Sequence, residues 1–447
     1  MAEARRFLAR IAWLGGRWQR DVLLAAQDGH WQQVRPGTSD AKDAEVLDAP
    51  VLPGLVDAHS HAFQRAIAGL TERSAAGRED FWSWRDRMYA AALRISPQQL
   101  EAIAALLYAE LLAAGYTQVC EFHYLHNDVD GRPYANAAEM SQALMRAARQ
   151  VGIGLTLLPT LYMRSGFGAS GLREDQRRFA STPASVLEIA ENVPRSSTLS
   201  AGIALHSLRA VDEGALREAA QAARAAGMPV HIHIAEQQQE VEDCLRVHGQ
   251  RPVEWLLRHA ALDAHWNLVH ATQATAAELQ SLHPTAAAIV LCPSTEANLG
   301  DGVFDLPAWL AAGGAWSIGS DSHVTRSWSE ELRLLEYSQR FVLRRRNVAA
   351  LAAGGESTAG VLFEGALAGG GAAAGLPLAG FAPGQRADLC VVDTDAPALA
   401  GIPDGHLLDA LVFSSPGVAM ERVVVAGKDV DLRPPTAAFT EAMRALW

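Results

Sequence analysis

His59 and His61 lie two positions apart, close behind an apolar run that ends in Asp57. Residues two apart on a strand point to the same side, so both imidazoles could bind one ion. The pair alone is weak evidence, because the chain has 15 histidines and most histidines in proteins bind no metal. The pair therefore needs partners from elsewhere in the chain.

Such partners follow other apolar runs. His233 belongs to an HxHxxE segment, His270 ends another run, and Asp321 belongs to a late Ser-Asp pair. Three histidines and one carboxylate, with a position left for water, form a hydrolytic metal site. We therefore expect His59, His61, His233 and Asp321 to hold one divalent ion, Zn²⁺ or alternatively Fe²⁺. Such an ion lowers the pKa of water from about 15.7 to about 7.

Proton transfer needs further groups near the ion. Glu236, three residues beyond His233, could take a proton from water and pass it to a leaving group. His270 could polarise the substrate or stabilise a tetrahedral intermediate, and Asp321 completes the expected catalytic set. His231 shares the strand face of His233 but lacks its HxxE spacing, so we expect a buried, hydrogen-bonded neighbour there.

Eight apolar runs separated by helical stretches must bring these residues together, and this alternation predicts a (β/α)₈ TIM barrel over residues 54–382. Active sites of such barrels lie at the carboxyl ends of the strands. Residues 1–53 and 383–432 predict a small composite β-sandwich domain built from both chain ends, and 433–447 a C-terminal helix. The expected strands are 54–59, 117–124, 153–162, 200–208, 229–236, 265–272, 287–294 and 315–323.

Composition narrows the class of partner. The chain has 447 residues and a net charge of −12, which disfavours nucleic acid. Its four cysteines form no CxxC pair, which fits a reducing compartment. The N-terminal apolar stretch is short and interrupted by Arg10, and no run is long enough to span a bilayer. We expect a cytoplasmic protein that binds a small molecule and no membrane.

The combination PGxxDxHxH, HxHxxE, strand-end His and Ser-Asp resembles the amidohydrolase superfamily in its mononuclear deaminase branch. This resemblance implies a metal-bearing barrel with a composite β domain, the four ligands above, and proton-handling roles for Glu236 and His270. Dinuclear branches carry a carboxylated lysine on the fourth strand. The stretch AGIALHSLRAV has no lysine, which favours one metal.

Within that superfamily, the segments DFWSWRDRMY, CEFHYLHND and GSDSHVTRSWSEELRLLEY are similar to the N-formimino-L-glutamate deiminases of histidine degradation. That similarity implies hydrolysis of N-formimino-L-glutamate to N-formyl-L-glutamate and ammonia by a homodimer. The substrate is a cationic amidine that also carries two carboxylates. An aminohydrolase of a purine, pterin or related ring is the alternative, and a catalytically inactive barrel is a third interpretation.

A dicarboxylate substrate requires donors away from the metal. Arg85 and Arg209 could pair with the carboxylates, since guanidinium groups bind them with two parallel hydrogen bonds. Tyr124 could add a hydroxyl donor, and Gln64 and His206 could orient the substrate. The resemblance implies the same five positions. Arg85 also fits a solvated charge on a helix, whereas the strand-end position of Arg209 directs it at the site.

Overall fold

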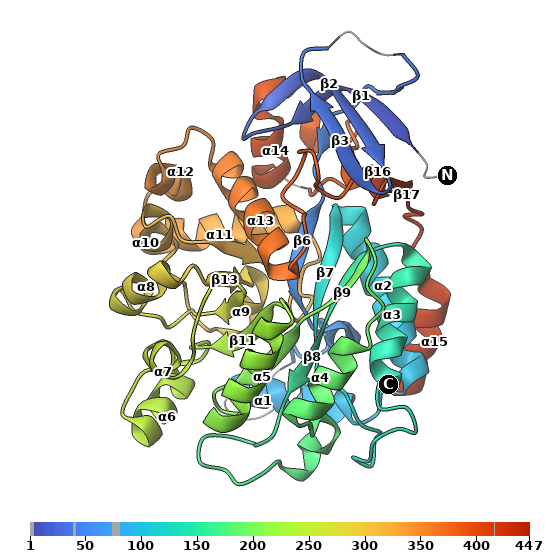
Figure 1. The fold of residues 1–447 in the computed structure, drawn as a ribbon. Coiled ribbons are helices and arrows are strands. Elements are labelled where there is room, and N and C mark those ends of the chain that lie inside the picture. Colours follow the sequence, from blue (N-terminus) through green and yellow to red (C-terminus); the bar gives the residue numbers. More distant parts are fainter. Residues whose placement is uncertain (1–3, 39–41, 74–80, 415) are drawn as a thin grey trace.

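The computed structural model describes residues 4–38, 42–73, 81–414 and 416–447. Its centre is a parallel sheet ordered β6-β7-β8-β10-β11-β12-β13-β14, with the short strand β9 beside β8 (Figure 1). All eight runs expected from the sequence form strands of this sheet. Their bounds are β6 Leu55–Ser60, β7 Tyr116–His123, β8 Gly154–Leu161, β9 Leu199–Ala201, β10 Ile203–Ser207, β11 Val230–Ile234, β12 Trp266–His270, β13 Ala288–Leu291 and β14 Trp316–Ile318.

The first and last strands close this sheet into a barrel. The Asp321 amide donates to the His59 carbonyl at 2.9 Å, and the His61 amide donates to the Asp321 carbonyl at 3.2 Å. Gly319 permits this approach, because a Cβ atom there would lie 2.6 Å from the Cβ atom of His59. The predicted (β/α)₈ barrel is confirmed, and the seam that closes it runs through the expected metal ligands.

Helices surround the barrel and are delimited by ordinary capping chemistry. The helix after residue 96 begins with a capping box between Ser96 and Gln99 and ends at Gly115, whose φ is 97°. The bounds are α1 Phe81–Ala92, α2 Pro97–Ala114, α3 Glu139–Val151, α4 Pro183–Glu191, α5 Glu213–Ala225, α6 Gln238–His248, α7 Pro252–His259, α8 Ala276–Leu282, α9 Pro293–Leu299, α10 Leu306–Ala311, α11 Trp328–Leu343, α12 Val348–Ala353, α13 Thr358–Ala374, α14 Leu407–Phe413 and α15 Thr436–Leu446.

Both chain ends contribute to a separate eight-stranded sheet, ordered β17-β16-β15-β5-β1-β2-β3, with β4 paired to β1. It has its own apolar core, in which the rings of Phe7 and Phe381 both contact the ring of Trp31. The strands are β1 Arg5–Trp13, β2 Trp18–Gln27, β3 His30–Arg35, β4 Glu45–Leu47, β5 Val51–Leu52, β15 Leu389–Val392, β16 Met420–Val425 and β17 Lys428–Asp429.

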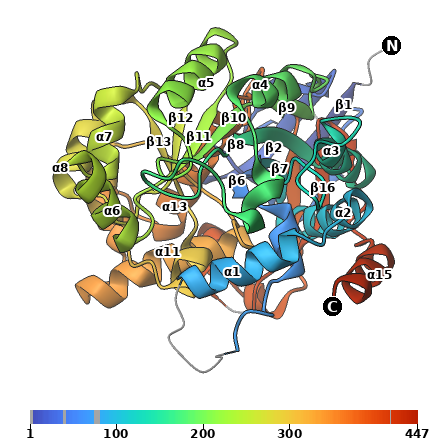
Figure 2. The same cartoon turned by 90° about the horizontal axis from the view of Figure 1, so that it is seen from below.

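The two ends of the barrel are covered differently. The buried Arg386, next to β15, donates to the Thr117 carbonyl and the Gln118 side chain, so the separate sheet lies at the amino end of β7. Helix α1 lies at the other end, below the strands in Figure 1 and in front of them in Figure 2. The carboxyl ends of the strands therefore face a pocket bounded by α1.

Among the described residues, no helix combines the length and the hydrophobicity that crossing a membrane would require.

Candidate active site

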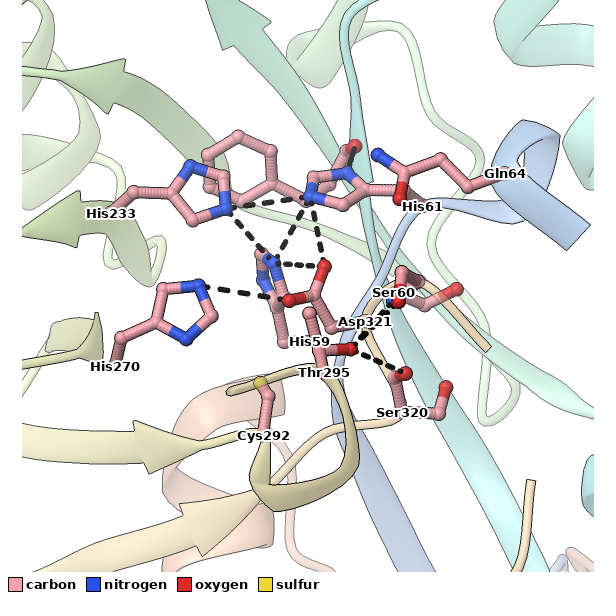
Figure 3. Close-up of polar contacts among 12 residues, drawn as sticks. His59, Ser60, His61, Gln64, His233, His270, Cys292, Thr295, Ser320 and Asp321 are labelled. Atoms are coloured by element: carbon pink, nitrogen blue, oxygen red, sulfur yellow. Dashed lines mark hydrogen bonds and ion pairs between the residues drawn. The ribbon is translucent and has the colours of Figure 1, made fainter. Parts of the chain in front are cut away.

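Three imidazoles meet at the carboxyl end of the barrel (Figure 3). The Nε2 atoms of His59, His61 and His233 are separated by 3.0, 3.1 and 3.3 Å. The Oδ1 atom of Asp321 lies 3.6 Å from Nε2 of His59 and 3.4 Å from Nε2 of His61. All four side chains are buried. The four residues expected from the sequence as metal ligands thus present their donor atoms to one point.

Backbone carbonyls fix the tautomers of two of these rings. Nδ1 of His61 lies 2.8 Å from the Phe122 carbonyl, and Nδ1 of His233 lies 2.9 Å from the His206 carbonyl. Each Nδ1 must donate its proton there, so each Nε2 directs a lone pair at the other across 3.3 Å. Two lone pairs at that distance repel unless a cation lies between them. The donor set therefore fits a divalent ion.

The pKa shifts agree with neutral ligands. Burial lowers the pKa of His59 well below its usual value, and His61 and His270 lower it further. Burial also lowers the pKa of His61, although Asp321 opposes this effect. Burial and the neighbouring His59 lower the pKa of His233. Metal ligation requires neutral imidazole, so burial removes a proton that would compete with the ion.

The direction of the Asp321 carboxylate is set by contacts of the preceding residue, Ser320. Asp57 accepts hydrogen bonds from the Ser320 amide at 2.8 Å and the Ser320 hydroxyl at 2.5 Å. Asp321 has a φ of 48°, a left-handed conformation that costs a non-glycine residue about 1–3 kcal/mol. The clamp from β6 holds the chain in this turn and directs the Asp321 side chain at the histidines.

Glu236 and His270 lie beside this cluster. Nε2 of His270 is 3.6 Å from Oδ2 of Asp321 and 3.9 Å from Oε1 of Glu236. Burial raises the pKa of Glu236 to about 7, although His270 and Arg209 oppose this rise. A carboxyl group with that pKa can both accept and return a proton near neutral pH.

The pKa of His270 is raised, in contrast to the lowered pKa values of the other three histidines. Burial by itself would lower its pKa, but Glu236, a hydrogen bond to Glu296 and Asp321 raise it to about 10. Oε1 of Glu296 lies 3.3 Å from Nδ1 of His270 and also accepts from the Cys292 amide at 2.9 Å. Our sequence analysis did not select Glu296. It lies in α9, which begins directly after β13, the seventh barrel strand, so its nearness to that strand end was the available signal.

All five residues expected to bind substrate line one pocket with the cluster. Gln64, on the turn η1 (Ala62–Ala66), donates to the Tyr124 hydroxyl at 3.1 Å. Arg209 lies 3.9 Å from Glu236, and its guanidinium group lies 5.7 Å from the ring of Trp82. The guanidinium group of Arg85 lies 4.3 Å from that same ring. Arg85 is therefore not a solvated surface charge. We call the part of the pocket lined by Arg85 and Arg209 the guanidinium side, and the part around Asp321 and the three histidine ligands the metal side.

Several other candidates lie outside the pocket lining. His231 hydrogen-bonds the Ala373 carbonyl at 2.9 Å, in agreement with a buried neighbour. His126 contacts the Thr160 carbonyl, and His323 contacts the Ser320 hydroxyl at 3.0 Å. The sequence analysis also missed part of the lining, which comes from α1, from the position directly after β8 and from α9. They are Phe81, Met88, Tyr89, Tyr162, Thr295 and Leu299.

Comparisons with known proteins agree with this geometry. The model of the amidohydrolase family matches residues 51–430. A formimidoylglutamate deiminase from Pseudomonas aeruginosa is 46% identical over 94% of this chain and 93% of its own length. A 5-methylthioadenosine/S-adenosylhomocysteine deaminase from Halobacterium salinarum is 27% identical over 94% and 90%. The crystal structure of an amidohydrolase from Brucella melitensis superposes with a TM-score of 0.91, at 40% identity over 99% of both chains. The chain belongs to the amidohydrolase family.

Proposed function

We propose that this protein hydrolyses N-formimino-L-glutamate to N-formyl-L-glutamate and ammonia. It is a hydrolase that acts on a C–N bond of a linear amidine. The extensive identity to the Pseudomonas aeruginosa formimidoylglutamate deiminase supports this substrate. The distribution of charge in the pocket supports it independently.

That charge distribution carries the proposal. Arg85 makes no ion pair within the described parts of the chain, and the Nε atoms of Arg85 and Arg209 are buried without a hydrogen-bond partner. On the metal side, the carboxyl groups of Glu236 and Asp321 lie within 4 Å of His270. Formiminoglutamate has the matching pattern, since its two carboxylates lie at one end and the amidine that is hydrolysed lies at the other. A molecule with carboxylates at one end satisfies the guanidinium side.

His59, His61, His233 and Asp321 would hold one divalent ion, for which we propose zinc because three imidazoles and a carboxylate suit it. When bound, the ion would act as a Lewis acid and make water acidic enough to attack near neutral pH. Iron(II) is the alternative that the same donors accept.

The protein's own residues perform the proton transfers. Glu236 accepts a proton from the attacking water as its oxygen bonds to the formimino carbon and the C=N double bond becomes single. The same carboxyl group then gives that proton to the terminal nitrogen. The C–N bond breaks, ammonia leaves, the hydroxyl proton of the intermediate passes to the Glu236 carboxylate, and the carbonyl of the formyl group forms. His270, protonated at neutral pH, stabilises negative charge that develops on the attacking oxygen.

The remaining proposed roles concern orientation. Arg85 and Arg209 bind the carboxylates, Tyr124 donates a hydroxyl hydrogen, and Gln64 and His206 direct the formimino group towards Glu236. The four free, buried cysteines fit a cytoplasmic location, where thiols stay reduced. A homodimer remains our prediction from the sequence, and light scattering on the purified protein would test it.

A substrate panel tests the function. Ammonia release from N-formimino-L-glutamate should exceed release from adenosine, 5-methylthioadenosine and aminopterins by at least about a thousandfold. The ring aminohydrolase alternative has support from relatives at 27% identity. Turnover of rings without turnover of formiminoglutamate would refute the proposal and favour that alternative.

A further inference from the structure

Three buried polar side chains form a wall of the guanidinium side: Tyr89 on α1, Tyr162 after β8, and Gln176 in the turn η2 (Glu174–Phe179). The two tyrosine hydroxyl oxygens lie 3.1 Å apart. Nε2 of Gln176 lies 3.2 Å from the Tyr89 hydroxyl and 3.0 Å from the Tyr162 hydroxyl. Tyr89 and Tyr162 line the pocket, whereas Gln176 lies behind them and is fully buried.

A backbone contact fixes the orientation of the Gln176 amide. The Arg173 amide donates to Oε1 of Gln176 at 3.0 Å, so the amide nitrogen must face the two tyrosines. That nitrogen carries two hydrogens, one for each hydroxyl oxygen. Both tyrosines therefore accept a hydrogen bond from Gln176, and neither can donate to it.

One of the two tyrosine hydroxyl hydrogens is left without an acceptor within the described part of the protein. Two hydroxyl hydrogens remain, and one of them bridges the 3.1 Å gap between the tyrosines. Over the described ranges, the other hydroxyl hydrogen has no protein acceptor. A buried donor without a partner costs about 1–3 kcal/mol, so a ligand that supplies an acceptor here gains that amount.

The surroundings determine the charge of that acceptor. The guanidinium group of Arg85 lies 5.4 Å from the ring of Tyr89, and the ring of His206 lies 4.2 Å from that of Tyr162. Arg209 lines the same pocket as both tyrosines; burial lowers its pKa, but Glu240, Glu236 and, to a smaller extent, the two tyrosines raise it. An acceptor beside two guanidinium groups is best satisfied by an anion, and a carboxylate also has the geometry they bind.

We infer that Tyr89, Tyr162 and Gln176 form a donor relay that gives one hydroxyl hydrogen bond to a substrate carboxylate. Gln176 is a positioning residue: it never touches the substrate but forces one tyrosine to donate to the other and the second to donate into the pocket. This relay extends the proposed function, because the carboxylate belongs to formiminoglutamate. It also predicts that the enzyme rejects a ring without a carboxylate, which would leave the hydrogen unpaired.

The first test replaces each tyrosine by phenylalanine, which keeps the ring and removes the hydroxyl. Only one of the two hydroxyls donates to the substrate, so we expect at least one of Tyr89→Phe and Tyr162→Phe to raise KM for N-formimino-L-glutamate about 10-fold or more, with kcat changed less than about threefold. Tyr116→Phe is the matched control, because Tyr116 is buried and its hydroxyl has no hydrogen-bond partner among the residues that the structure describes. Its KM should equal that of the unmodified enzyme. An unchanged KM in both pocket variants would overturn the relay, as would a loss confined to kcat.

Two substrate analogues can show which carboxylate accepts the tyrosine hydrogen bond. N-Formimino-L-2-aminobutyrate lacks the side-chain carboxylate, and N-formimino-4-aminobutyrate lacks the α-carboxylate. The effect on KM of the tyrosine variant that weakens formiminoglutamate binding should disappear with one of these compounds and persist with the other. Persistence with both would mean that the hydroxyl contacts no carboxylate, and the relay would be wrong.

Gln176→Met tests positioning. It should raise KM about threefold to 10-fold alone and add nothing to the Tyr89→Phe/Tyr162→Phe double variant, because the relay is already absent there. An equal additional rise in that background would indicate a general structural role and contradict the inference.

Glutarate affinity, measured by calorimetry, distinguishes failure of the relay from failure of the proposed function. If the unmodified enzyme releases no ammonia from formiminoglutamate, the proposed function fails, yet weaker glutarate binding in at least one tyrosine variant would still support the relay. Unchanged glutarate binding in both variants would refute it.

Discussion

On the metal side of the pocket, nearly every functional side chain comes from the end of a barrel strand. On the guanidinium side, Tyr162 and Arg209 also follow strand ends, but Arg85 and Tyr89 come from the helix α1. The metal side is held by main-chain hydrogen bonds across the barrel seam, such as those between His59, His61 and Asp321. The guanidinium side is held by side-chain contacts, such as Gln176 with the two tyrosines.

This difference indicates that the metal side and the guanidinium side have separate roles. Main-chain bonds tolerate little movement, so they suit a site whose donor atoms must converge to within tenths of an ångström. Side-chain contacts are easier to exchange without disturbing the barrel, so they suit the part that selects the substrate. We therefore expect changes on the metal side to affect turnover and changes on the guanidinium side to affect substrate affinity.

Removing the metal is expected to have the largest effect. Dialysis against a chelator should reduce ammonia release below detection, because the Lewis acid is lost. It should also lower Tm, since an ion at about a thousandfold excess over its Kd stabilises the fold by about 4 kcal/mol. Adding Zn²⁺ should restore both properties. Full activity in metal-free protein, checked by elemental analysis, would contradict the proposed site.

Glu236→Gln should lower kcat about a thousandfold, because the amide cannot accept the proton from water. The metal content should stay at one ion per chain, since Glu236 is not among the proposed ligands. Glu242→Gln, an exposed change on the neighbouring α6, is the matched control and should be fully active. Activity of Glu236→Gln within about 10-fold of the unmodified enzyme would remove Glu236 from the mechanism.

Arg209→Met and Arg85→Met should each raise KM for formiminoglutamate about 10-fold to 100-fold, the range expected when a charged hydrogen bond is lost. Their kcat should fall much less, which would sharpen the contrast with Glu236. Arg217→Met, on the exposed face of α5, serves as the control. A loss of kcat with normal KM would mean that the two sides of the pocket do not divide their roles.

Glu296→Gln is expected to have the smallest effect. Glutamine retains an oxygen that accepts from the Cys292 amide and from Nδ1 of His270, so the imidazole keeps its orientation and only a charge is lost. We expect kcat to fall less than about 10-fold. The kcat of Glu296→Ala should fall further. Equal kcat values for the two variants would indicate that the orientation of the His270 imidazole does not depend on its contact with residue 296.

The sequence alone identified the barrel, the four proposed ligands, Glu236 and His270. This was possible because a parallel barrel brings all strand ends to one rim, so a residue's position relative to the end of its own strand predicts where it lies. Local spacing therefore carried information about tertiary position. The same reasoning applied to Glu296 but was not used for the seventh strand.

Only the tertiary structure decided the remainder. Nothing in the local pattern of α1 indicates that Tyr89 meets Tyr162, 73 residues later, or that Gln176 lies behind both. Helix and loop positions depend on packing against the rest of the fold, which has no fixed relation to sequence spacing. The orientation of the Gln176 amide, and with it the hydrogen left for a substrate, follows from a single contact with the Arg173 amide.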